Sequence, residues 1–168
     1  MCPESTVEPH LALADVDEEM LKELLALALV QASADEVTPP LGSTPSWNPE
    51  RIAWFHSYHR AAAAGLEGPA REKSWAVVAD GTVAGSIRLK RTAPGSVETG
   101  IWLGRSFRGQ GLGRLALQLV AAEARARGFT VLEASTTLGN KAAQSLLASL
   151  GAELTFEGAV VKARQAFL

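Results

Sequence analysis

The sequence predicts an α/β protein in which helices cover the faces of one mixed β-sheet. Three observations carry this prediction: segments with helical periodicity alternate with β-rich runs, three such runs follow one another over 74–104, and a glycine-rich loop joins the last of them to an apolar helix. The predicted order is β-α-α-β-β-β-α-β-α-β-β. The chain has 168 residues, which suits a single domain over 1–168, with 1–7 expected to be a flexible N-terminus.

The N-terminal segment begins with an alternating run at 10–15, which predicts a short strand. Asp15 or Asp17 then serves as the N-cap of a first helix, because acids and leucines at helical spacing follow it up to about residue 32. Residues 33–48 are rich in proline, serine and threonine and are predicted to be a loop.

A second helix is predicted from Pro49 to about Ala64, with Asn48 as its N-cap and Gly65 as its stop. The β-rich run that follows divides at Asp80-Gly81, a strong hairpin signal. Pro94-Gly95 turns the chain again, into a third strand over 96–104.

The C-terminal part continues with a helix from Leu112 that stops at Gly128. A strand over 129–136 and a short helix over 140–149 come next, and a last hairpin over 152–168 turns near Gly158. Neither internal repeats nor a low-complexity linker interrupts this order.

Composition narrows the function classes. Hydrophobic residues make up 47% and charged residues 20% of the chain, and the net charge is −2, so the basic surface of a nucleic-acid-binding protein is not expected. The single cysteine, Cys2, leaves no intrachain disulfide and no cysteine-rich zinc site. The first ten residues do not resemble a secretory signal, and the apolar run at 20–32 is too short to span a membrane, so a cytoplasmic protein is expected.

The loop holding Gly109, Gly111 and Gly113 predicts an anion site, because a glycine-rich turn before a helix aims backbone N–H groups at one point. Two common nucleotide motifs do not fit it. A dinucleotide fingerprint needs a third glycine where Arg114 stands, and a P-loop counted from Gly104 lacks its lysine. A left-handed turn without a ligand is the remaining alternative.

Arg108-Gly109-Gln110-Gly111-Leu112-Gly113 resembles the Q/R-x-x-G-x-G/A pyrophosphate loop of the GNAT family of N-acetyltransferases. The preceding "ETGIWLG" resembles the fourth strand of that family, and the segment opened by Asn140 resembles its next-to-last helix. The resemblance covers 74–152 well and 8–64 only by the order of the elements. It implies the GNAT fold and an enzyme that uses acetyl-coenzyme A as cosubstrate and needs no metal.

The resemblance also implies which residues bind the coenzyme. The pyrophosphate would lie against the loop amides and neighbouring arginines: Arg105, Arg108, Gly109, Gln110, Gly111, Leu112, Gly113 and Arg114. The pantetheine arm would lie along Ile101, Trp102 and Leu103 and contact Asn140, although Asn140 also suits a simple N-cap. The Leu103 amide would face the acetyl carbonyl, where a donor strengthens its bond as the oxyanion forms.

Proton transfer needs a base, because an alkyl amine with a pKa near ~10 must lose a proton before it attacks. Alternation places Glu98, Gly100 and Trp102 on one face of their strand, and Glu98 matches a strand-four glutamate that acts as general base in several members of the family. The alternative is an edge-strand glutamate that faces solvent or pairs with Arg88 or Lys90.

The general acid is harder to assign. The family's tyrosine position corresponds to Leu147, and the only tyrosine, Tyr58, lies in the second predicted helix. Ser145, a water molecule or direct departure of the thiolate are the alternatives. His56 and His59 stand three residues apart, but without a third ligand nearby they indicate packing or surface histidines rather than a metal site.

The acceptor is expected to be a primary amine of a small molecule, attacked directly in a ternary complex. In the family the pocket is built from the first two helices, their loop and the last hairpin. Here the loop carries Asp35, Glu36, Trp47 and Glu50, which suit a cationic polyamine or aminosugar unless they are merely solvated. The alternatives are a protein α-amine as acceptor, or a non-catalytic sensor of acyl-coenzyme A; a homodimer is common among relatives.

Overall fold

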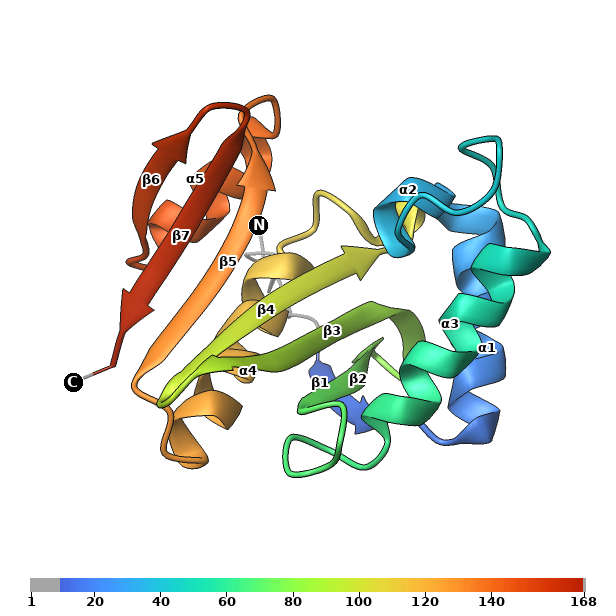
Figure 1. The fold of residues 1–168 in the computed structure, drawn as a ribbon, viewed down its shortest axis with the longest axis horizontal. Coiled ribbons are helices and arrows are strands. Elements are labelled where there is room, and N and C mark those ends of the chain that lie inside the picture. The colour runs from blue at the N-terminus through green and yellow to red at the C-terminus, as the bar shows by residue number, and fades with distance from the viewer. Residues whose placement is uncertain (1–9, 168) are drawn as a thin grey trace, which may run out of the picture.

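A seven-stranded mixed sheet runs through residues 10–167, the part of the chain that this computed structural model describes (Figure 1). The predicted N-terminal segment 1–7 lies outside the described residues. The strand order is β1-β2-β3-β4-β5-β7-β6. The strands are β1 Leu11–Asp15, β2 Glu72–Ala79, β3 Thr82–Ala93, β4 Ser96–Leu103, β5 Val131–Thr137, β6 Glu153–Glu157 and β7 Val160–Ala166.

The helices are α1 Glu18–Gln31, α2 Ala34–Val37, α3 Pro49–Ala62, α4 Leu112–Ala126 and α5 Lys141–Ser149, with a short 3₁₀ helix at Arg105–Phe107. Apart from α2 and the 3₁₀ turn, the order of elements is the predicted one, and the predicted mixed α/β class is confirmed. Within the described range, no helix is both long and apolar enough to cross a membrane.

The predicted helix starts and turns are confirmed by their hydrogen bonds and backbone angles. Asp17 caps α1 by accepting from the Met20 amide at 2.8 Å, and Asn48 caps α3. Asp80 and Gly81 have φ values of 48° and 80°, as the two-residue turn that matches the twist of paired strands requires.

The stretch 33–48, predicted to be a loop throughout, contains the short helix α2. The Ser33 amide donates to the Glu36 carboxylate at 3.0 Å, which favours a helical turn too short to leave a periodic pattern in the sequence. Arg51 holds the rest of this stretch from α3. Arg51 is 1% exposed, and its guanidinium pairs with Asp35 at 2.9 Å and donates to the Leu41 carbonyl at 3.1 Å.

Each face of the sheet has its own hydrophobic core. One cluster packs α4 against the sheet through residues such as Leu89, Val97 and Val120. The other packs α1 and α3 against the opposite face through Leu24 and Phe55. The sheet therefore separates two layers of helices, so a site can open on either side of one strand.

β4 and β5 are paired over only part of their length. Their parallel register joins Ser96–Glu98 to Val131–Glu133 and goes no further. Figure 1 shows the two strands starting close together and then spreading, with β7, β6 and α5 following β5 away from β4. From Thr99 to Leu103, β4 therefore has a neighbouring strand on its β3 side only.

Candidate active site

Two grooves meet at the second half of β4. The first, here called the splay groove, has a volume of about 710 Å³ and lies where β4 and β5 part, between α4 and α5. It brings together most of the residues predicted to bind the coenzyme: Ile101, Trp102, Leu103, Arg108, Gly109, Gly111, Leu112, Gly113, Arg114 and Asn140. The sequence placed these residues in three separate segments, and the fold gathers them in one groove.

The glycine loop reaches the groove in a conformation that needs glycine. Gly109 and Gly111 have φ values of 72° and 80°, and Gly111 is the N-cap of α4. A Cβ atom added at either position would meet no other atom within 4 Å. Glycine is therefore needed at these two positions for its left-handed backbone and not for lack of space. This backbone leads into the start of α4, whose first amides are free to bind an anion.

Arg108 connects the loop to two neighbouring elements. Its Nε donates to the Leu103 carbonyl at 2.9 Å, and its guanidinium pairs with Glu36 of α2 at 3.0 Å. Burial alone would raise the pKa of Glu36, but the hydrogen bonds from Arg108 and Ser33 lower it below the ordinary value. Glu36 is therefore ionised at neutral pH and already has a cationic partner.

Arg105 and Gln110, also predicted to bind the coenzyme, are exposed and do not line the splay groove. The Gln110 amide instead donates to the Ser106 carbonyl at 2.8 Å, within its own loop. The structure therefore gives Gln110 a role in the shape of the loop.

The edge of β4 that faces the groove offers free amides. Gly104 donates to the Ala84 carbonyl of β3 at 2.9 Å. Because hydrogen-bonding direction alternates along an antiparallel strand, the amides of Leu103 and Ile101 point away from β3, toward the splay groove. The Leu103 amide therefore has the direction that an oxyanion donor needs.

Thr99 lies deeper on the same edge. It is 4% exposed and lines the splay groove, and its hydroxyl has no hydrogen-bond partner within the described residues. A buried hydroxyl without a partner carries a desolvation cost that binding a ligand can relieve. Sequence reasoning missed this residue, because nothing in "VETGIWLG" distinguishes an unpartnered threonine from an ordinary strand threonine.

We expect Thr99→Val to stabilise the free protein by about 1 kcal/mol, because an apolar group of the same shape removes the unmet hydrogen bond. Chemical denaturation of the two proteins measures the change. Ser86→Ala is the contrast: the Ser86 hydroxyl is equally buried but donates to the Trp75 carbonyl at 2.8 Å, so its loss should destabilise the protein. A Thr99→Val variant that is less stable than the wild type would contradict an unpartnered hydroxyl.

The helix α5 places the remaining predicted residues differently. Asn140 lines the groove and also caps α5 by accepting from the Ala143 amide at 3.0 Å, so its two expected roles are compatible. Leu147, the family's tyrosine position, lines the groove as well. Ser145 is exposed and is not among the lining residues, so the fold does not bring its hydroxyl to the groove.

The second groove, here called the α3 groove, lies on the opposite face of β4 and has a volume of about 740 Å³. Glu98 lines it and forms an ion pair with Arg88, Nη2 to Oε1, at 2.9 Å. Arg88 is also 3.7 Å from Glu72, which accepts a 2.6 Å hydrogen bond from the hydroxyl of Tyr58. Glu98, Arg88, Glu72 and Tyr58 thus form one connected polar chain on the groove wall.

The sequence pointed to Arg88 only as an alternative partner of Glu98, and it did not point to Glu72 or Tyr58 as groove residues. The polar chain depends on cross-strand register: Arg88 lies opposite Gly100, and Glu72 lies opposite Lys90. In the sequence, Glu72 is only a glutamate at the start of a strand, which is a weak signal of a groove residue. The packing of α3 over β2 is what makes its side chain mostly buried.

Burial shapes the ionisation of this groove. It raises the pKa of Tyr58, and Glu72 at its hydroxyl raises it further, so the phenol stays protonated at neutral pH. Burial alone would lower the pKa of Arg88, but the hydrogen bond and charge of Glu98 raise it. His59 lies with Nδ1 2.8 Å from the Ser74 hydroxyl, and burial lowers its pKa to about 4, so it is neutral at pH 7.

Other predicted features lie elsewhere. Of the loop residues expected in the acceptor pocket, only Glu36 lines the α3 groove; Asp35 pairs with Arg51, and Trp47 donates to a carbonyl at the end of α1. The last hairpin, also expected there, contributes no lining residue. Across residues 10–167 no group of three or more histidine, cysteine or acidic side chains is arranged to hold a metal ion.

Known proteins resemble this chain in both sequence and fold. The family model "Acetyltransferase (GNAT) family" matches residues 34–152, while a comparison with curated proteins finds no match. A RimL ribosomal-protein α-N-acetyltransferase in complex with coenzyme A has a TM-score of 0.73 and 18% identity, covering 98% of this chain and 97% of that one. The GNAT domain of PAT from S. lividans has a TM-score of 0.71 and 16% identity, covering 95% of this chain and 90% of that one.

A third solved structure, the paia N-acetyltransferase from Thermoplasma acidophilum in complex with coenzyme A, has a TM-score of 0.68 and 15% identity, covering 94% of this chain and 99% of that one. The structural similarity confirms the predicted fold, and the family match, which spans well over half of the chain, confirms the predicted resemblance. The chain therefore belongs to the acetyltransferase (GNAT) family.

Proposed function

We propose that the protein transfers an acetyl group from acetyl-coenzyme A to a primary amine of a small molecule by direct attack in a ternary complex. One observation carries the proposal: the splay groove and the α3 groove open on opposite sides of β4 and share Gly100, Ile101 and Trp102. A donor in one groove and an acceptor in the other would meet at this strand, so transfer needs no intermediate attached to the protein.

The splay groove fits coenzyme A chemically. Amides from Gly109 to Gly113, with Arg108 and Arg114, would hold its pyrophosphate at the start of α4. The open amides of Ile101 and Leu103 would bind the pantetheine arm as an added strand does, and the unpartnered Thr99 hydroxyl supplies one more polar group along this edge. The thioester supplies an acetyl group with a good leaving group, and the chain supplies position and charge.

Glu98 is proposed as the base. It lines the α3 groove two residues from Gly100 on the same face of β4, and its side chain is 35% exposed, so an amine or an intervening water can reach it. The Leu103 amide, on the edge of β4 that faces the splay groove, is proposed to stabilise charge on the acetyl oxygen. The lining of the splay groove has Leu147 at the family's tyrosine position and includes no tyrosine elsewhere, which favours departure of the thiolate without a tyrosine acid.

A protein α-amine is the second candidate acceptor. It is favoured by the similarity to a RimL α-N-protein acetyltransferase over 98% of this chain and 97% of that one. Both candidates share the same chemistry at β4 and differ in what else the α3 groove receives.

Thiol release from acetyl-coenzyme A, measured against aminoglycosides, polyamines, amino acids and short peptides with free N-termini, tests the proposal. We expect turnover with one or more small amines. Turnover with peptides only would establish the second candidate instead. Binding of coenzyme A without turnover of any amine would contradict the proposed acetyl transfer and support a sensor of acyl-coenzyme A.

A further inference from the structure

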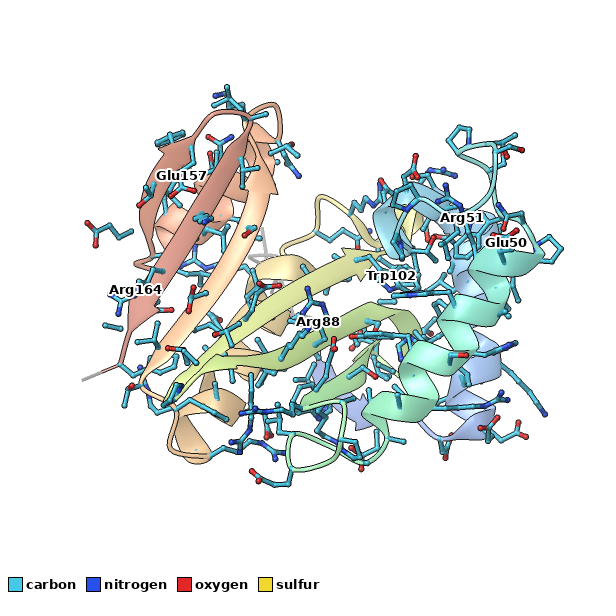
Figure 2. The ribbon with its side chains drawn as sticks, viewed as in Figure 1. Glu50, Arg51, Arg88, Trp102, Glu157 and Arg164 are labelled. Atoms are coloured by element: carbon cyan, nitrogen blue, oxygen red, sulfur yellow. The ribbon has the colours of Figure 1, made fainter. Side chains whose placement is uncertain are left out.

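Arg88 lines the α3 groove beside Gly100, a residue that also lines the splay groove. A Cβ atom added at Gly100 would lie 3.0 Å from Arg88 Nε and 3.2 Å from its Nη2. The guanidinium therefore lies against the backbone of β4, in space that only a glycine leaves free. Because Gly100 lines both grooves, the positive charge lies close to the part of β4 that they share, and Figure 2 shows the Arg88 side chain beside this strand.

The guanidinium has hydrogen-bonding capacity to spare. Nη2 donates to Glu98, and the buried Nη1 has no hydrogen-bond partner within residues 10–167 and lies 3.7 Å from Glu72, whose nearer oxygen already accepts from Tyr58. An arginine carries five N–H donors, and the one hydrogen bond that this guanidinium makes to the described residues, from Nη2 to Glu98, leaves other donors for an acceptor oxygen brought by a ligand. The side chain is 30% exposed, so a ligand in the groove can contact it.

The charge balance of the groove disfavours a polycation. Glu36, Glu72 and Glu98 line it, but Glu36 is paired with Arg108, and the other two face Arg88. Lys90 adds further positive charge to the lining, whereas Arg91 is paired with Glu67. Each of these three carboxylates faces an arginine, and only Glu36 is released if Arg108 turns to the pyrophosphate, so the lining does not match the several ammonium groups of a polyamine or an aminosugar.

We infer that the acceptor carries a carbonyl or carboxylate oxygen beside its amine, and that Arg88 binds this oxygen while Glu98 receives the amine. The two side chains are in contact, so the two acceptor groups must be only a few bonds apart. An α-amino acid and the N-terminal residue of a peptide both have this chemistry. The inference rests on the proposed function and replaces the polyamine or aminosugar expected from the sequence.

Acceptors matched except for this oxygen test the inference. Phenylalaninamide and phenethylamine differ only by the carboxamide, and the aromatic ring suits a groove lined by Trp54 and Tyr58. We expect Arg88→Met to lower kcat/KM for phenylalaninamide at least tenfold, mainly through KM, and to change it less than threefold for phenethylamine. Comparing each acceptor with itself in the two proteins cancels the difference between the pKa values of the two amines.

Lys90→Met is the matched control, because Lys90 is a cation of the same groove but lies on the exposed end of β3. It should leave the ratio between the two acceptors unchanged. Arg88→Lys keeps the positive charge but lacks the planar, paired donors of a guanidinium, so it should recover only part of the preference for phenylalaninamide. Equal loss for both acceptors in Arg88→Met, in a variant with wild-type circular dichroism, would overturn the inference.

Titration calorimetry of both amines separates this inference from the proposed function. If thiol release is absent with either amine, the proposed function fails, and the binding titration decides the inference alone. Binding of phenylalaninamide that weakens at least tenfold in Arg88→Met supports it, and unchanged binding overturns it. Free phenylalanine and a phenylalanyl peptide as further acceptors distinguish an amino acid from a protein N-terminus.

Discussion

Glu98→Gln lowers kcat at pH 7 by about a hundredfold or more, the contribution that a positioned general base makes. The amide keeps the shape of the side chain and can still accept a hydrogen bond from Arg88, which donates to Glu98 at 2.9 Å in the wild type. What it cannot do is take up a proton from the attacking amine. Initial rates of thiol release measured from pH 7 to pH 9 give the size of the loss.

The loss should shrink as pH rises, because an amine with a pKa near ~8 to ~10 loses its proton to solvent in this range and needs the base less. Glu72→Gln is the matched control: it also removes a carboxylate beside Arg88, but from a side chain that is 12% exposed and bound to Tyr58. We expect the control to stay within about fivefold of the wild type. A Glu98→Gln loss that does not vary with pH would assign Glu98 to holding Arg88 rather than to proton transfer.

The sequence predicted most of the fold because its signals are local. Asp17, Asn48 and the Asp80-Gly81 pair each act within a few residues, and each lies where the pattern placed it. Helix α2 was missed because four residues make little more than one turn, too few for an apolar pattern of helical spacing to repeat. It is held by Arg51, whose partners lie up to 16 residues away.

The two grooves show the same contrast between local sequence signals and contacts that join distant parts of the chain. The splay groove could be predicted because its loop, strand and helix cap each carry a local motif, and the family resemblance joins them. The α3 groove could not, because its chemistry depends on Arg88, Glu72 and Tyr58, which come from three elements and meet through strand register and the packing of α3. Ser145 shows the limit of assigning a side chain to a site from its place on a predicted helix: it lies five residues after the Asn140 cap and is exposed.

The splay groove and the α3 groove are also linked at the C-terminal end of β4, near Leu103. Glu36 lines both, and its partner Arg108 both begins the glycine loop and donates to the Leu103 carbonyl. An anion at the loop would compete with Glu36 for the same guanidinium. The position of α2, which borders the acceptor side, is therefore tied to the residue that opens the anion site.

Gly111→Val raises the Kd of coenzyme A by about a hundredfold or more, which corresponds to roughly 2.7 kcal/mol. Gly111 has φ 80°, where a β-branched residue is strained, so the N-terminal turn of α4 must shift. The shift moves several amides that would each contribute about 1.5 to 3 kcal/mol when bonded to a charged group. Titration calorimetry with coenzyme A measures the loss without requiring turnover.

Gly128→Val separates loss of the anion site from loss of stability. Gly128 follows the other end of α4, has φ 87° and, like Gly111, has no atom within 4 Å of an added Cβ. The two substitutions therefore impose the same backbone strain on the same helix, but only one faces the splay groove. If both variants unfold at similar denaturant concentrations and only Gly111→Val loses coenzyme A, the loop binds through its backbone. If Gly111→Val still binds within about threefold of the wild type, the glycines serve only to turn the chain.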